Sequence, residues 1–286
     1  MSQKDRPPRV NPVVDPRYSR SLEYGAAILE CFSAECPVLR ISEMADMIGV
    51  SRSTTHRYSM TLVRLGYLEQ DEKRRYRLAH GAARPGIAAI GVLCGELHAE
   101  TILEELRERT RATVSLGVLE GSRVVYVHRF FAHKAGQYEA DLGLGVGAYV
   151  PVHCTAIGKA LLASLGESEQ AAILANLTLA RHGPKTIASK RKLADELARF
   201  RLEGIAVCDE EQAAGVRSIA KAVVCPGAPR LMAISVTAPA RGYTVSRLRD
   251  DFGAHLERAA TRVRMAYGRA VARDERPTGG ERRRGG

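Results

Sequence analysis

The chain has 286 residues, which is enough for two domains of ordinary size and for a sizeable hydrophobic core. With 45% apolar and 26% charged residues its composition is that of a globular protein, which excludes collagen, fibrous repeats and wholesale disorder. The 43 Lys and Arg residues outnumber the 32 Asp and Glu residues and give a net charge of +11. This charge permits an anionic partner but does not by itself require one.

Nothing in the sequence indicates a membrane span, a secretion signal or a resident metal. The longest apolar stretch, at residues 87–94, is far shorter than the roughly 20 residues of a membrane helix, and the first 20 residues lack an apolar core. The 6 cysteines are scattered without a Cys-x-x-Cys pair. We therefore expect a cytoplasmic protein with reduced thiols, no membrane partner, no metal site and no cofactor.

Composition divides the chain into five segments. Residues 1–17, rich in proline and charge, and residues 271–286, rich in glycine and arginine, are both expected to be disordered. Residues 18–84 form a helical unit that ends at a junction near Pro85–Gly86. A linker region at 85–110, with a helix from residue 97, leads into a mixed segment at 111–270.

The first unit contains three predicted helices. Apolar residues at helical spacing predict one near residues 22–32. Ser42 is expected to cap the second helix, and Gly49 to end it in the left-handed conformation. Ser51 is expected to cap a third helix that runs to about residue 66. The residues expected to anchor this helix in the core are Met60, Leu62, Val63 and Leu65.

A two-stranded wing is predicted directly after these helices. Residues 66–69 and 76–78 alternate in the manner of strands around a polar turn that carries three basic residues. This order is typical of a winged helix-turn-helix, whose third helix enters the major groove of double-stranded DNA while the wing touches phosphates. The expected DNA-binding residues are Ser51, Arg52, Ser53, Thr54, Thr55, His56, Arg57, Lys73, Arg74 and Arg75. The alternative for this unit is a small helical protein-contact domain in which residues 73–75 are a solvated turn. Arg57 could instead pack back against a helix or pair with an acid.

The second unit alternates between strand and helix patterns. A hairpin is predicted at 113–119 and 122–130, with further strands at 205–209, 217–224 and 230–237. Helices are predicted at 156–165, 167–175, 189–203 and 244–267. The fold class is therefore α+β, with a sheet covered by helices.

Six segments of the chain resemble the IclR family of bacterial transcriptional regulators, and the likeness extends over residues 18–270. They are RSLEYGAAILECF (20–32), ISEMADMIGVSRSTTHR (41–57), the wing start GYL (66–68), PVHCTAIGKALLA (151–163), GIAVCDEEQAAGVRSIA (204–220) and LMAISVTAP (231–239). The opening helix also resembles the branch that acts in aromatic-acid catabolism. The resemblance implies a GAF-like α/β effector-binding domain after the winged domain, and homodimers that can pair into tetramers. The chain departs from the family pattern at Thr55 and Tyr58, where apolar residues are expected.

An effector site is predicted at the start of the helix at 156–165. Thr155 can cap this helix and leave the N–H groups of Ala156 and Ile157 for a carboxylate, while Ser235 and Thr237 share one face of a strand. The resemblance implies that the pocket uses Ala156, Ile157, Cys208, Ser218, Ser235 and Thr237. An ordinary buried helix start and a solvated strand face are the alternatives. Cys208 stands where the family commonly has an acidic residue.

Other groups near this site are given structural roles. We expect the acidic run at 209–211 to meet Arg217 or solvate a turn, and Lys159 to lie at the surface. No catalytic residue is predicted. An alternative function is a Cys-dependent hydrolase or transferase with an accessory helical domain, built on Cys154 beside His153. An RNA-binding or protein-interaction module is a third possibility, but aromatics for base stacking are only 5% of residues.

The sequence thus predicts a ligand-responsive regulator of transcription that binds operator DNA as a dimer and senses a small organic acid. Effector binding is expected to shift the population of paired winged domains through the helix at 97–110.

Overall fold

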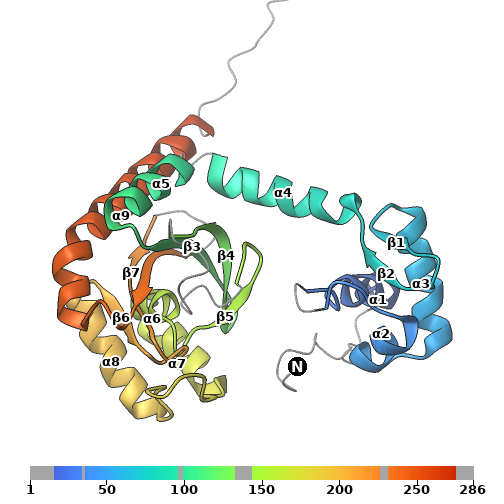
Figure 1. Ribbon diagram of the computed structural model, residues 1–286, viewed down its shortest axis with the longest axis horizontal. Coiled ribbons are helices and arrows are strands. Elements are labelled where there is room, and N and C mark those ends of the chain that lie inside the picture. Colours follow the sequence, from blue (N-terminus) through green and yellow to red (C-terminus); the bar gives the residue numbers. More distant parts are fainter. Residues whose placement is uncertain (1–15, 34–35, 96–98, 133–143, 226–230, 275–286) are drawn as a thin grey trace, which may run out of the picture. The chain divides into compact units, whose positions relative to one another are not determined.

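The computed structural model describes residues 16–33, 36–95, 99–132, 144–225 and 231–274. The chain divides into two compact units after Gly91, and each is described by itself (Figure 1). Within the described residues, no helix is both long enough and apolar enough to cross a membrane.

The first unit is a three-helix fold with a wing. Its helices are α1 (Arg20–Leu29), α2 (Ile41–Ile48) and α3 (Arg52–Arg64), and the antiparallel strands β1 (Leu68–Gln70) and β2 (Tyr76–Leu78) form the wing. The helices and the wing share one core, in which the fully buried side chains include Ile28, Met44, Ile48, Leu68 and Tyr76. The predicted order of helix, turn, helix and wing is confirmed.

The capping of α2 differs from the prediction. Helix α2 begins at Ile41, so Ser42 is inside the helix and does not cap it. Instead, the carboxylate of Glu43 accepts a hydrogen bond of 2.6 Å from the backbone N–H of Arg40. The helix ends at Gly49, whose φ of 72° is in the left-handed region that glycine adopts without strain.

The anchoring of α3 was predicted only in part. Leu62 is buried, but Met60 and Leu65 are 36% and 63% exposed. Two small hydroxyl residues, Thr55 and Ser59, are fully buried and face the other helices in their place. Small residues at these positions allow the helices to pack closely where the larger apolar side chains were expected.

Helix α4 (His80–Gly95) runs through Pro85 and Gly86, where a junction was expected, and the two compact units divide after Gly91. Its start packs closely on the wing: an ideal Cβ on Gly81 would lie 2.8 Å from the carbonyl carbon of Gly66. Helix α5 (Ala99–Thr110) covers the described part of the helix expected from residue 97, with Leu103 and Leu106 buried.

The second unit is built on a six-stranded antiparallel sheet in the order β5-β4-β3-β8-β7-β6. The strands are β3 (Thr113–Glu120), β4 (Arg123–Phe130), β5 (Tyr149–Pro151), β6 (Ala206–Asp209), β7 (Val216–Val223) and β8 (Met232–Pro239). The hairpin and the last three strands were predicted. Strand β5 was not, because three residues are too short for a clear alternation.

The remaining helices are α6 (Ala156–Ser164), α7 (Glu167–Asn176), α8 (Lys190–Glu203) and α9 (Val245–Asp274). Helix α6 lies on the concave face of the curled sheet, with α8 beside it, and α5 and α9 pack on the opposite face (Figure 1). Helix α9 continues past the boundary expected at residue 270. Residues 1–15 and 275–286 of the expected tails lie outside the described residues.

Register decides which residues face α6. An ideal Cβ on Gly117 of β3 would lie 2.8 Å from the Cδ1 of Ile157, so the odd-numbered residues of β3 face α6. Gly117 pairs with Ala233 of β8, and Ser235 and Thr237 therefore share this face. The even residues of β8 face α5 and α9, as the alternation predicts.

Candidate DNA interface and effector site

Helix α3 presents a polar face to solvent. The side chains of Ser51, Arg52, Ser53, His56 and Arg57 are exposed, and Thr54 is half-buried. Ser51 caps the helix as predicted, because its hydroxyl accepts a hydrogen bond of 3.2 Å from the N–H of Thr54. Since no acidic residue is in the first turn, this end of α3 is positively charged.

Thr55 does not belong to this face, and its prediction as a DNA contact was wrong. Its side chain is fully buried, and its hydroxyl donates to the carbonyl of Ser51 at 3.0 Å. Tyr58 is half-buried against the ring of Tyr24, and its hydroxyl accepts a hydrogen bond of 3.3 Å from Arg57. Arg57 is therefore exposed but packed back onto its own helix, the alternative considered above.

The three basic residues of the wing differ in exposure and in their partners. Arg75 donates its Nε–H to the carboxylate of Asp71 at 2.8 Å, so its charge supports the turn. The backbone N–H of Arg75 also donates to this carboxylate and, with the guanidinium, lowers the pKa of Asp71. Lys73 and Arg74 are exposed at the tip. These two side chains are the better placed to touch phosphate.

In the second unit, four of the predicted effector residues lie on one face of the sheet. Cys208 pairs with Ser218, Ser218 with Thr237, and Ser235 with Ser115, and all face α6. Cys208, Ser218 and Ser235 are buried, which excludes a solvated strand face for Ser235. The sheet thus brings hydroxyl groups from three strands under the start of one helix.

The start of α6 is fixed to this face. The hydroxyl of Thr155 accepts a hydrogen bond of 3.1 Å from the N–H of Gly158 and donates to the carbonyl of Pro151 at 2.7 Å. Thr155 therefore caps α6 as predicted. The thiol of Cys208 donates to the carbonyl of Cys154 at 3.2 Å. Ala156 and Ile157 are buried at the first turn, whose N–H groups have no acceptor within the helix.

Sequence reasoning missed three residues on the same face. Ser115 pairs with Ser235 on one side and with Arg129 of β4 on the other. The guanidinium of Arg129 lies over the ring of Tyr126, which is buried. The sequence does contain a signal for Ser115. Thr113 and Ser115 are two residues apart in β3, so strand alternation places both hydroxyls on one face, but β3 was recognised only as a strand.

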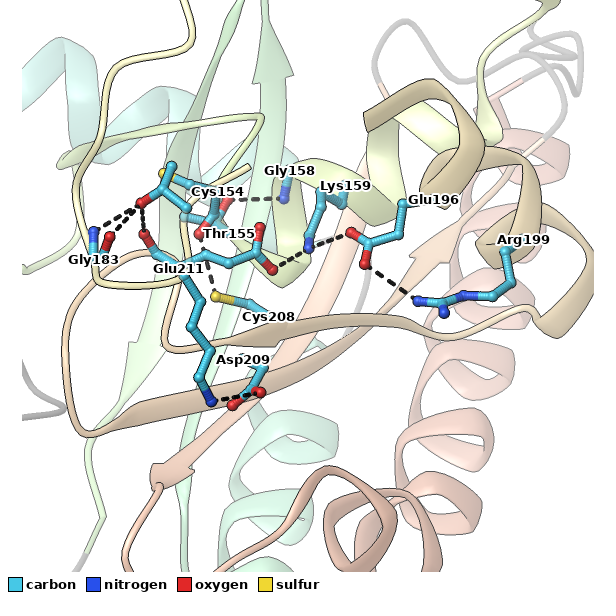
Figure 2. A network of polar contacts seen from close by, with 12 residues as sticks. Cys154, Thr155, Gly158, Lys159, Gly183, Glu196, Arg199, Cys208, Asp209 and Glu211 are labelled. Atoms are coloured by element: carbon cyan, nitrogen blue, oxygen red, sulfur yellow. Dashed lines mark hydrogen bonds and ion pairs between the residues drawn. The ribbon is translucent and has the colours of Figure 1, made fainter. Parts of the chain in front are cut away.

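Lys159 is fully buried, which corrects the expectation of a surface lysine. Figure 2 shows its ammonium between the carboxylates of Glu211 and Glu196, with the Glu196 oxygen at 2.9 Å. Burial raises the pKa of Glu211, and Lys159 offsets this only in part. The second carboxylate oxygen of Glu211 is buried and has no hydrogen-bond partner among the described residues. Arg199 also pairs with Glu196 at 3.2 Å, so two basic and two acidic side chains meet in this network.

The acidic run at 209–211 is divided between surface and core. Arg217 donates to Asp209 at 2.5 Å and to Glu210 at 3.2 Å, as predicted. Burial opposes ionisation of Asp209, but Arg217 and Lys185 outweigh it and lower the pKa. Glu210 has a φ of 53°, and this left-handed turn interrupts the alternation after β6. Because of this interruption, the side chain of Glu211 is buried in the core.

The thiols near α6 are poorly suited to nucleophilic catalysis. Burial raises the pKa of both Cys154 and Cys208, and the proximity of Cys208 and Glu211 raises that of Cys154 further. A thiol nucleophile must instead be poised as a thiolate. The geometry therefore does not favour the Cys-dependent hydrolase.

Two family models match these two units. The model described as IclR helix-turn-helix domain matches residues 21–72, and the bacterial transcriptional regulator IclR C-terminal model matches residues 97–265. The chain belongs to the IclR family of transcriptional regulators.

Relatives support the same assignment. The HTH-type transcriptional regulator XynR of Escherichia coli is 35% identical over 202 residues, which cover 70% of this chain and 79% of that protein. The transcriptional repressor IclR of Escherichia coli is 28% identical over 264 residues, which cover 87% and 90%. These curated relatives are regulators rather than enzymes.

Solved structures show the fold directly. The IclR-family regulator from Brucella abortus has a TM-score of 0.73 and 26% identity, covering 88% of this chain and 94% of that chain. An IclR homologue from Microbacterium hydrocarbonoxydans, complexed with 4-hydroxybenzoate, has a TM-score of 0.75 and 23% identity, covering 87% and 99%. This IclR-family chain is a regulator with a winged DNA-binding domain and a C-terminal effector domain, and the fold class is confirmed.

Proposed function

We propose that the effector of this regulator is a small organic carboxylate bound between the start of α6 and the polar face of the sheet. The observation that carries this proposal is the convergence of Ser115, Ser235 and Arg129 in one cross-strand row. Hydroxyls and a guanidinium are strong donors to a carboxylate, and the N-terminus of α6 adds a favourable dipole. Tyr126, on the same face, supplies an aromatic wall for the remainder of the ligand.

The proposal is tested by a thermal-shift and calorimetric panel of aromatic and short aliphatic carboxylates, each beside its neutral amide. The panel includes 4-hydroxybenzoate, the compound in the Microbacterium structure. We expect a carboxylate to raise the melting temperature and its neutral amide to leave it unchanged. Ser235→Ala and Arg129→Gln should each weaken binding about 10-fold to 100-fold, the range for hydrogen bonds to a charged group.

The exposed Ser246 of α9 gives a matched control, and Ser246→Ala should bind like the wild type. A carboxylate that binds the wild type, Ser235→Ala and Arg129→Gln equally well would place the effector elsewhere.

We propose further that the chain binds operator DNA as a homodimer, and that dimers can pair into tetramers. The exposed face of α3, led by Arg52 and His56, is proposed to enter the major groove, with Lys73 and Arg74 on flanking phosphates. Two winged domains are needed because one helix reads only a half-site. Light scattering of the full chain tests the assembly, and a monomer at operator-binding concentrations would contradict it.

A DNA fragment from the upstream region of the gene tests these DNA-binding residues across a range of salt. Lys73→Ala should weaken binding to all sequences alike and reduce the slope of log affinity against log salt by about 1, because one phosphate fewer is neutralised. Arg52→Ala should weaken binding to the specific fragment more than binding to random DNA if it touches a base. Lys192→Ala is the control, because this exposed lysine lies on α8 in the second unit and is not part of the proposed DNA face, so its loss should leave DNA affinity unchanged. Binding indifferent to sequence in the wild type would contradict the proposal.

A further inference from the structure

Two histidines and a cysteine meet beside the start of α6. His153 and Cys154 directly precede Thr155, and His182 lies in the connection between α7 and α8. One ligand atom of each, a ring nitrogen or the thiol sulfur, lies within 4.8 Å of the other two. The two rings have centroids 5.7 Å apart. No sequence motif indicates this cluster, because His182 is separated from the others by two helices.

The distances are compatible with a bound cation. Zinc binds imidazole nitrogen at about 2.0–2.1 Å and thiolate sulfur at about 2.3 Å, which puts tetrahedral ligands roughly 3.3–3.7 Å apart. The observed cluster therefore needs to contract by at most about 1.5 Å. His153 and Cys154 are buried, whereas His182 is exposed, and an exposed side chain changes rotamer readily.

The surroundings of His153 favour ligation. Its Nε2 lies 2.9 Å from the carbonyl oxygen of Ala180, the geometry of a hydrogen bond to a backbone acceptor. When Nε2 carries the proton, the neutral ring has its lone pair on Nδ1. A hydrogen bond from the second ring nitrogen to a backbone carbonyl is the usual support of a metal-bound histidine. The same connection that supplies His182 thus also orients His153.

Ligation by Cys154 requires its thiolate form, because a metal ion binds the deprotonated sulfur. Metal binding is therefore expected to release a proton from Cys154.

We propose that His153, Cys154 and His182 bind one thiophilic divalent cation of the zinc class. Two nitrogens and one sulfur suit Zn²⁺ and Co²⁺ and do not suit Mg²⁺ or Ca²⁺, which take oxygen ligands. The exposed side of His182 leaves the fourth position to water or another small ligand. This site lies next to the proposed effector site but uses none of its residues.

Cobalt is the probe for this site. The full chain, stripped with a chelator and kept reduced, is titrated with Co²⁺ and then with Zn²⁺. We expect one equivalent of cobalt per chain, visible bands of tetrahedral cobalt, and a cobalt–thiolate charge-transfer band that zinc abolishes. Proton release, followed with a pH indicator, should accompany the titration.

Variants separate the site from adventitious binding. His182→Ala should lower cobalt affinity at least 10-fold and leave the fold intact, because the side chain is exposed. Cys154→Ser should abolish the charge-transfer band. His80→Ala and Cys36→Ser are matched controls outside the cluster and should behave as the wild type.

Uptake of less than one equivalent by the wild type, or a His182→Ala protein with the affinity and spectrum of His80→Ala, would overturn the proposal. If Cys154→Ser does not fold, the His182→Ala result decides alone. Carboxylate binding measured in the presence of chelator tests the effector site separately, so that either proposal can fail without the other.

Discussion

The side chain of Lys159 shows how one residue can hold several elements together. Its ammonium joins the carboxylate of Glu211, after β6, to that of Glu196 on α8, while its own backbone is in α6 (Figure 2). A buried ion pair adds little net stability, since desolvation offsets most of the attraction. Removing one partner is costly, because it leaves an uncompensated buried charge.

We therefore expect Lys159→Met to lower the free energy of unfolding by about 3–5 kcal/mol, the range for a broken buried pair. Chemical denaturation of the full chain measures this. The exposed Lys192 of α8 provides the control, and Lys192→Met should change stability by less than about 0.5 kcal/mol. Adding Glu211→Gln to Lys159→Met should restore part of the stability. Equal stability of the two methionine variants would show that the pair carries no such role.

At the scale of single elements, α6 owes its position to a glycine. An ideal Cβ on Gly158 would lie 2.7 Å from the carbonyl carbon of Val152, closer than real side chains approach a backbone. The helix can therefore lie against the preceding segment only if this residue has no side chain. The same close approach holds the first turn of α6 over the sheet.

Gly158→Ala should accordingly destabilise the second unit by about 1–3 kcal/mol through overpacking, and weaken carboxylate binding by displacing the first turn. Gly253 in α9 is the matched control, because its added Cβ would make ordinary contact with Ile205 at 3.5 Å. Gly253→Ala should leave stability unchanged or raise it by up to about 1 kcal/mol. Thermal unfolding compares the two, and a Gly158→Ala protein as stable as Gly253→Ala would contradict this account.

On the scale of the whole molecule, the sheet links the effector face to the helices on its other side. Strand β3 carries Ser115 on the face toward α6 and packs against α5 on the opposite face. Helix α5 is in turn joined to α9 by an ion pair between Glu105 and Arg262. An effector that shifts β3 thus has a physical route to the helix at the start of the second unit.

Ser235→Ala should consequently keep the operator affinity of the wild type without effector and show little of the change that effector causes. The reason is that a ligand shifts a conformational equilibrium only by its difference in affinity for the two states. Operator binding measured by fluorescence anisotropy, with and without the carboxylate found in the panel, checks this. An unaltered effector response in Ser235→Ala would show that the signal arises at another site.

The sequence predicted most elements because periodicity and capping are local. The alternation of β8 assigned Ser235 and Thr237 to one face, and Thr155 was recognised as a cap from its position alone. Two local interpretations failed, and in the first of them another local contact, the hydrogen bond from the Arg40 N–H to Glu43, decided the cap. Glu43 rather than Ser42 caps α2, and α4 continues through Pro85.

The site was predictable only where its residues are on recognisable motifs. The face of α3 and the hydroxyls of β8 follow from helix and strand geometry, so single segments specify them. Arg129 and His182 do not, because their neighbours are distant in the sequence and are set by strand register and by the path of a connection. Burial is also decided by the tertiary structure. Lys159 and Thr55 are polar residue types that usually lie at the surface, yet both are fully buried here.

What the sequence determined by itself is therefore the order of elements, the division into a winged domain and a sheet domain, and membership of a regulator family. All of these are properties of contiguous segments. Only the tertiary structure decided which hydroxyls meet Arg129, which acid meets Lys159, and that His182 lies beside His153 and Cys154. Each of these pairings joins segments far apart in the chain, and such contacts form only when the sheet and its helices pack around one core.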